Sequence, residues 1–129
     1  MMIIPEGAGV QTPDFTGGFF DLLGLRFDEA TGDRVVIRWK CRPELLQPAG
    51  LLHGGVYCSV VETAASVGAA LWHGGNVVGV ANQTDFLRAV RSGELTAVGT
   101  PVHRGRSQQL WQVEIADDRG RLVARGQVR

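Results

Sequence analysis

Apolar residues recur at helical spacing along residues 54–73, the longest periodic segment of the chain. The repeat falls every three or four residues, at Val56, Val60, Thr63, Val67 and Leu71. Alanines at four further positions widen this surface almost around the helix, and Gly74 follows as the expected end. A helix that is apolar all round is buried rather than half exposed. The pattern therefore predicts one long helix at the centre of the fold.

Alternating apolar and polar residues predict strands on both sides of this helix. Before it, residues 25–41 alternate around a turn at residues 31–33, which places Val35, Ile37 and Trp39 on one face. After it come four strand-like runs, at residues 76–87, 94–103, 108–117 and 121–129. A short hairpin turn at Asp118, Arg119 and Gly120 joins the last two runs. We expect the four runs to form an antiparallel meander.

One helix among many strands predicts an α+β fold in which a curved antiparallel sheet wraps around the helix. Residues 42–50 form a loop broken by prolines and a glycine. Residues 14–24 predict a short helix or a turn-rich lid, with five apolar side chains turned inward: Phe15, Phe19, Phe20, Leu22 and Leu23. With 129 residues, the chain is long enough for a single domain over residues 1–129.

The composition narrows the class of protein. Thirteen basic and thirteen acidic residues cancel, which argues against general nucleic-acid binding because that needs a basic surface. No segment has the roughly 18 uninterrupted apolar residues of a membrane span, and residues 1–10 lack the basic region of a signal peptide. Cys41 and Cys58 predict reduced thiols in a cytoplasmic protein. The three histidines show no ligand spacing, so we expect no metal.

Two residues of the long helix are candidates for chemistry. Gly54 lies where the loop gives way to the helix, so its N–H has no partner inside the helix and favours a carbonyl oxygen or an oxyanion. Glu62 lies eight residues further on in an apolar run, where a carboxylate is rarely buried without a partner. It could act as a general base or a nucleophile. Equally, the glycines could only allow tight packing, and Glu62 could pair with an arginine.

Three further residues surround this pair. Ser66 lies one turn after Glu62 on the same face, where its hydroxyl could hold water or substrate, or simply allow close helix packing. Gln47 precedes the helix in the loop, where a glutamine is usually solvated. His53 is more often a structural histidine that fixes the loop than a catalyst.

Taken together, Gln47, Gly50, His53-Gly54-Gly55, Glu62 and Ser66 resemble the motif of the hotdog-fold acyl-CoA thioesterases. The likeness is to the branch with the phenylacetate-pathway, 4-hydroxybenzoyl-CoA (Arthrobacter-type) and 1,4-dihydroxy-2-naphthoyl-CoA thioesterases. It runs from about residue 15 to the end, and the closing segment GTPVHRGRSQQLWQVEI is also similar. Some relatives have Asn-His where this chain has Asp85-Phe86, so the resemblance extends to the reaction but does not fix the acyl substrate.

The resemblance implies a role for each residue. The Gly54 amide would bind the thioester carbonyl, and Glu62 would be the nucleophile or the base. Gln47 and Ser66 would orient the carbonyl or the water, and His53 would support the loop. Four arginines would hold the phosphates of coenzyme A, which is part of the substrate rather than a cofactor: Arg88, Arg91, Arg104 and Arg106.

Other functions share this fold. A hotdog hydratase would usually pair an Asp with a His four or five residues later, and no such pair follows Asp85. An acyl-CoA-binding module without catalysis would tolerate the loss of Glu62, and a structural protein would need neither Gln47 nor Glu62. An aryl or medium-chain acyl group is expected. Trp72, Phe86, Leu87 and the N-terminal phenylalanines could form an apolar pocket for it, or they could equally be part of the core.

The spacing of the two candidates also predicts an assembly. Eight residues of α-helix separate Gly54 from Glu62 by roughly 12 Å, so one reacting carbon cannot lie near both. Two antiparallel helices related by a twofold axis would bring Gly54 of one chain beside Glu62 of the other. We therefore expect a homodimer with shared active sites, and the resemblance further implies a homotetramer.

Overall fold

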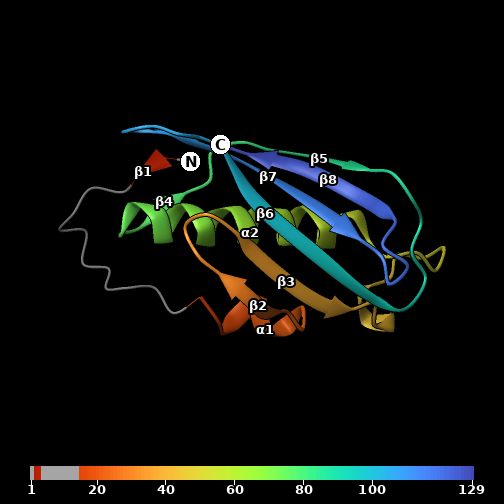
Figure 1. Cartoon of the computed structure of the whole chain (residues 1–129). Coiled ribbons are helices and arrows are strands. Elements are labelled where there is room, and N and C mark those ends of the chain that lie inside the picture. The colour runs from red at the N-terminus through yellow and green to blue at the C-terminus, as the bar shows by residue number, and fades with distance from the viewer. Residues whose placement is uncertain (1, 4–14) are drawn as a thin grey trace.

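The computed structural model describes residues 2–3 and 15–129. The prediction that residues 1–10 are not a signal peptide therefore lies outside the described residues, except for residues 2–3. Figure 1 shows a curved sheet that wraps around one long helix. The elements in chain order are β1 (Met2–Ile3), α1 (Gly18–Leu22), β2 (Arg26–Ala30), β3 (Val35–Lys40), the 3-10 helix η1 (Pro43–Leu45), α2 (Gly54–His73), β4 (Val77–Val78), β5 (Asn82–Phe86), β6 (Glu94–Arg104), β7 (Gln109–Ala116) and β8 (Leu122–Val128).

The main sheet has six strands in the order β2-β3-β6-β7-β8-β5, and every neighbouring pair is antiparallel. Alternate residues of β7 are buried from Gln109 to Ile115, as the period of a strand requires. Gln109 is the buried polar residue of this face, and it is satisfied: its Nε2 donates to the Ala69 carbonyl oxygen at 3.1 Å and its Oε1 accepts from Trp111 Nε1 at 2.7 Å. The predicted α+β fold is confirmed.

Helix α2 packs against the concave face of the sheet, where it contacts β3, β5, β6, β7 and β8. Close approach depends on Gly68, because a Cβ there would lie 2.5 Å from the Trp111 ring. The helix starts and ends as predicted, with Gly74 in the left-handed conformation at φ 79°. By length and composition α2 could cross a membrane, but the core helix of a folded domain meets the same criteria. In its apolar 18-residue window, 56% of the residues are buried in the fold.

The sequence predicted that α2 is buried on all sides, and this prediction is wrong for part of its surface. A polar stripe along α2 is only half buried, and it consists of Ser59, Glu62, Thr63 and Ser66. Leu71 and Trp72, near the end of the helix, are 38% and 44% exposed. The sheet packs against one side of α2, so side chains that point away from the sheet stay partly exposed in the single chain.

The predicted meander is wrong for its first run. Residues 76–87 divide into β4, which pairs with β1, and β5, which pairs with β8 at the far edge of the main sheet. Between them the chain bonds to the C-terminus, since the N–H groups of Val80 and Ala81 both donate to the Arg129 carbonyl oxygen. The remaining strands β6, β7 and β8 do form a meander.

Residues 15–24 include the short helix α1, but only part of the predicted apolar set turns inward. Phe20 and Leu23 are buried, and Phe20 stacks on Phe27 with ring centroids 4.9 Å apart. Phe19 and Leu22 are 58% and 70% exposed. A helix of five residues presents one narrow stripe to the core, so side chains on its other sides face outward. Phe15 is partly buried against the core.

Candidate active site

The start of helix α2 leaves one backbone donor free. The His53 side chain caps the helix, because its Nδ1 accepts a hydrogen bond from the Gly55 N–H at 2.8 Å. The N–H of Val56 donates to the His53 carbonyl oxygen at 2.9 Å. Among residues 15–129 the Gly54 N–H has no such partner. A free donor at the positive end of a helix dipole can bind a carbonyl oxygen or an oxyanion.

The loop before the helix is held in place by its own backbone. His53 N–H donates to the Leu45 carbonyl oxygen at 3.0 Å, and Leu52 N–H donates to that of Val90 at 2.8 Å. Gln47 N–H donates to the Leu51 carbonyl oxygen at 2.8 Å, and its side-chain oxygen accepts from the Ala49 N–H. His53 therefore fixes the helix entry, as the structural interpretation of this residue predicted.

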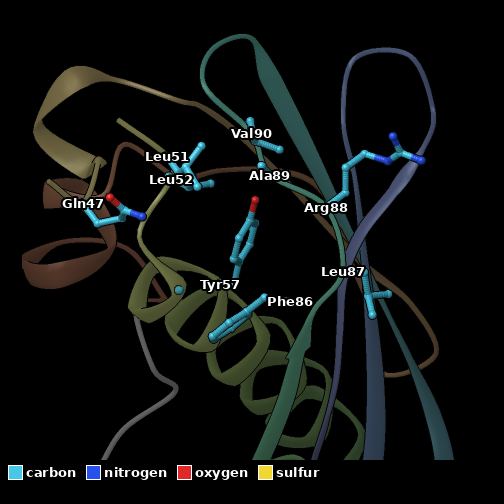
Figure 2. Close-up of a pocket in the computed structure, with 10 residues that line it drawn as sticks. Gln47, Leu51, Leu52, Tyr57, Phe86, Leu87, Arg88, Ala89 and Val90 are labelled. Carbon is cyan, nitrogen blue, oxygen red and sulfur yellow. The ribbon is translucent and has the colours of Figure 1, made fainter. Parts of the chain in front are cut away.

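A cavity of about 300 Å³ lies against the Gly54 end of the helix. Its walls come from the loop, from α2, and from the end of β5 with the segment after it: Gln47, Leu51, Leu52, Gly54, Tyr57, Phe86, Leu87, Arg88, Ala89 and Val90. Figure 2 shows Tyr57 in the middle of these residues, with Gln47 and Arg88 on opposite sides of it. The walls are mostly apolar, which suits the acyl part of a thioester.

Two aromatic rings shape the cavity next to Gly54. A Cβ at residue 54 would lie 2.5 Å from the Phe86 ring, so only glycine fits beneath that ring. The Tyr57 ring lies beside Phe86 at 5.8 Å between centroids. The Tyr57 hydroxyl is buried and has no hydrogen-bond partner among the described residues. Burial, and then the charges of Cys41 and Asp117, raise the pKa of Tyr57 to about 12.

Of the residues predicted to form an acyl pocket, Phe86 and Leu87 line this cavity and Trp72 does not. The backbone of Trp72 packs on Gly32 at the other end of α2, where a Cβ on the glycine would meet the Trp72 Cα at 2.8 Å. Phe19 lines a different cavity, of about 390 Å³, on the side of α2 that carries Gly55 and Ser59.

Glu62 lies two turns along α2 and does not line the cavity beside Gly54. It is half buried, and within residues 15–129 no arginine or lysine forms an ion pair with it. The structural interpretation of Glu62 as an ion-pair partner is therefore wrong for the described chain. Its Oε2 instead accepts a hydrogen bond from Asn82 Nδ2 at 3.4 Å. Ser66 lies one turn further along the same stripe.

The four arginines do not lie together. Arg88 lines the cavity, and Arg91 Nη1 donates to the Ala49 carbonyl oxygen at 3.4 Å. Arg104 belongs to the opposite end of α2, where it pairs with Asp33 at 2.7 Å and lies 5.2 Å from the centre of the Trp72 ring. Arg106 is exposed in the loop between β6 and β7. Within one chain, Arg88 therefore lies at the cavity beside Gly54, Arg91 contacts the loop before α2, and Arg104 lies at the other end of the helix.

Sequence reasoning missed Tyr57 and Asn82. Tyr57 stands three residues after Gly54, so helix periodicity alone places it on the same face and could have found it. Asn82 carries no local signal, because its contact with Glu62 depends on how β5 lies against α2.

Comparisons with known proteins agree with this geometry. Residues 49–124 match the family model of the thioesterase superfamily. A suspected esterase from Mycobacterium tuberculosis is 51% identical over 112 residues, which is 83% of this chain and 80% of that protein. The 1,4-dihydroxy-2-naphthoyl-CoA hydrolase of Escherichia coli is 34% identical, covering 82% of this chain and 79% of its own.

Solved structures show the same fold. AziG of S. sahachiroi has a TM-score of 0.85 at 52% identity, covering 87% of this chain and 93% of that chain. A thioesterase from Haemophilus influenzae has a TM-score of 0.79 at 32% identity, covering 84% and 78%. With the family model, these relatives show that the chain belongs to the thioesterase superfamily, with its hotdog fold, and is a thioester hydrolase.

Proposed function

We propose that the enzyme hydrolyses acyl-CoA thioesters with an aryl or medium-chain acyl group, releasing the free acid and CoA. The observation that carries this proposal is the Gly54 N–H beside a mostly apolar cavity, on the same helix as the Glu62 carboxylate. Within residues 15–129 the N–H has no hydrogen-bond partner and the carboxylate has no cationic partner. An oxyanion donor of this kind contributes about 10²–10³ in kcat. No further cofactor is needed for this chemistry, and we place the enzyme in the cytoplasm.

In the proposed reaction the thioester carbonyl oxygen binds the Gly54 N–H, and negative charge develops there as the carbonyl carbon is attacked. With Glu62 as general base, water adds to the carbon while its proton passes to the carboxylate. The C–S bond then breaks, and the CoA thiolate takes up a proton. With Glu62 as nucleophile, its oxygen attacks the carbonyl carbon, the C–S bond breaks and the CoA thiolate leaves and is protonated. The resulting mixed anhydride is hydrolysed by water in a second step. Gln47 and Ser66 would orient the carbonyl or the water.

Both reaction paths need Gly54 and Glu62 within reach of one carbon, and on one helix they are separated by roughly 12 Å. We therefore propose a homodimer in which each site takes Gly54 from one chain and Glu62 from the other, further assembled as a homotetramer. The stripe of α2 with Glu62 and Ser66 supports this, because its own chain leaves that stripe only half buried.

The test of the function is the Glu62→Gln variant, assayed by thiol release from a panel of aryl- and acyl-CoAs. The amide keeps the shape of the side chain but is neither a base nor a carboxylate nucleophile, so kcat should fall about 10²–10⁴-fold. Acyl-CoA binding, measured by calorimetry, should survive. Glu114→Gln, on the exposed face of β7, is the matched control. Wild-type turnover in Glu62→Gln would refute the assignment, and binding without turnover in the wild type would indicate a carrier.

A single turnover in H₂¹⁸O separates the general-base path from an anhydride path in which water attacks the Glu62 carbonyl. An anhydride path transfers one carboxylate oxygen of Glu62 to the acid product, so the first product is unlabelled when water attacks the enzyme's carbonyl. A general-base path places ¹⁸O in the product in the first turnover.

A further inference from the structure

Asn82 on strand β5 is the side chain that reaches the Glu62 carboxylate from the sheet. Its Nδ2 donates to Glu62 Oε2 at 3.4 Å and to the Cys58 carbonyl oxygen at 3.0 Å. In an α-helix the Cys58 carbonyl is also the one that accepts the Glu62 N–H. Helix side chains tilt toward the N-terminus, which brings the Glu62 carboxylate back over this same turn. One amide thus holds both the turn and the carboxylate.

Thr84 determines which way the Asn82 amide points. Its hydroxyl donates to Asn82 Oδ1 at 2.7 Å. The reversed amide would turn its oxygen toward the Cys58 carbonyl and the Glu62 carboxylate, which are both acceptors, and would lose both hydrogen bonds. The donor side of Asn82 therefore faces Glu62 for a chemical reason. Asn82 and Thr84 are two residues apart on one strand, so they share a face.

Gly79 supplies the space that the other carboxylate oxygen needs. A Cβ at residue 79 would lie 2.0 Å from Glu62 Oε1, far inside contact distance. The colliding atom is the end of a flexible side chain, so a methyl group there would move the carboxylate rather than the backbone. The carboxylate is therefore bounded on one side by Asn82 and on the other by the bare Cα of Gly79.

We propose that Asn82 is a positioning residue for Glu62: Thr84 orients its amide, the amide holds Oε2, and Gly79 leaves the space for Oε1. The inference rests on the proposed function, in which Glu62 reacts. A neutral amide fixes the direction of the carboxylate without neutralising its charge, as an arginine would. Orientation matters because a shift of about 1 Å in a reacting group can lower the rate by about 10²-fold.

Kinetics of four variants test the proposal. Asn82→Ala removes the amide and Gly79→Ala displaces the carboxylate, and each should lower kcat about 10- to 100-fold with KM within about twofold of wild type. Thr84→Val frees the amide to rotate and should lower kcat, but by less than Asn82→Ala does. Thr84→Ser keeps the hydroxyl and should have a kcat close to that of the wild type. Gly75→Ala is the matched control for Gly79→Ala, because a Cβ there meets only the His73 ring at 3.4 Å.

The split between kcat and KM separates positioning from a structural role. Unchanged kcat in both Asn82→Ala and Gly79→Ala would overturn the proposal. So would equal losses in Thr84→Val and Thr84→Ser. Thermal unfolding identifies variants that do not fold, and the Thr84 pair then decides, because it leaves the strand intact.

A spectroscopic readout keeps the proposal separate from the proposed function. The Asn82 side-chain NH₂ signals in a ¹H–¹⁵N correlation spectrum, assigned with Asn82→Ala, should shift in Glu62→Gln and in Thr84→Val but not in Gly75→Ala. If the wild type releases no thiol from any acyl-CoA, the proposed function fails. The spectrum alone then tests whether Asn82 holds the Glu62 carboxylate. Signals that do not respond to Glu62→Gln would overturn the contact.

Discussion

Tyr57 brings a polar atom into the apolar wall of the cavity. Its side chain is 3% exposed, and its hydroxyl has no hydrogen-bond partner within the described residues. A buried hydroxyl without a partner is destabilising, typically by about 1–3 kcal/mol. With its pKa raised by burial to about 12, the phenol stays protonated and remains a donor across the physiological range. Its position beside Gly54 makes it a neighbour of any acyl group bound there.

The Tyr57→Phe variant should therefore fold at least as well as the wild type at neutral pH. Removing an unpaired hydroxyl is expected to change the free energy of unfolding by less than about 1 kcal/mol, or to raise it. The folded pKa lies above the ordinary value of 10.0, so the wild type loses stability as pH rises from there toward about 12. Phenylalanine cannot ionise and should lack this loss. Urea unfolding at neutral and alkaline pH measures both effects, and a clear loss of stability at neutral pH would mean that the hydroxyl has a partner.

Arg88 lines the cavity beside Gly54, and Arg91 contacts the loop before α2 through the Ala49 carbonyl oxygen. If they bind CoA phosphates, replacing either with alanine should raise KM for a CoA thioester severalfold and much less for the matching pantetheine thioester. High salt should shrink the difference, because salt screens exposed charges. Arg125, exposed on β8, is a control position. Equal losses on both substrates would assign Arg88 and Arg91 to the fold.

At the scale of elements, the turn between β7 and β8 depends on one carboxylate. Asp117 Oδ1 accepts from the N–H groups of Arg119 and Arg121 at 3.0 and 2.9 Å, and Oδ2 accepts from Arg121 Nε at 2.7 Å. Burial alone would raise the pKa of Asp117, but the hydrogen bonds and charge of Arg121, with the N–H of Arg119, lower it overall. The sequence predicted this turn from the three residues that follow Asp117, and the structure shows Asp117 organising it.

The lowered pKa gives the turn a pH dependence. A carboxyl group with a depressed folded pKa stabilises the protein above its ordinary value of 3.8, and this stability is lost as pH falls through the folded pKa. Asp117→Asn should therefore lower Tm at neutral pH, with a difference from wild type that narrows as the pH falls below 3.8. Asp118→Asn, whose side chain is exposed in the same turn, is the control. A Tm difference independent of pH would contradict the prediction.

At the scale of the whole molecule, the shared active site can be tested by mixing two inactive variants, Glu62→Ala and Gly54→Pro. Proline at the first helical position removes the amide donor and leaves the helix able to form. A mixed dimer has one site with both wild-type residues and one with neither. Complete subunit exchange should restore about a quarter of wild-type activity, since half of the dimers are mixed and each has one intact site.

The ring of Phe86 must swing away to admit the proline, because it already touches Gly54. It is 56% exposed and can move, and Phe86→Ala measures the effect of that movement by itself. Native mass spectrometry shows whether mixed dimers form. Mixed dimers without activity would mean that the two chains do not share a site.

The local pattern predicted the long helix to the residue at its end and the hairpin strands, and the catalytic roles of Gly54 and Glu62 stay predictions. The local pattern failed where the burial or the strand pairing of a residue depends on tertiary contacts. Phe19 and Leu22 are as apolar as Phe20, yet a five-residue helix can bury only one stripe. Likewise, residues 76–87 look like one strand, but their backbone groups bond to β1, to Arg129 and to β8 in turn.

The sequence by itself determined what depends on neighbours along the chain: where α2 begins and ends, which strand residues face inward, and that a backbone donor and a carboxylate lie eight residues apart on one helix. These properties follow from helix and strand periods and from the special backbone of glycine. Tertiary structure alone decided that Asn82 meets Glu62, that Phe86 covers Gly54, and that Arg104 lies at the other end of α2 from Arg88. The residues in each of these pairs are distant in sequence. Their relative positions are therefore set only when β5 takes its place at the edge of the sheet beside β8 and the sheet packs against α2.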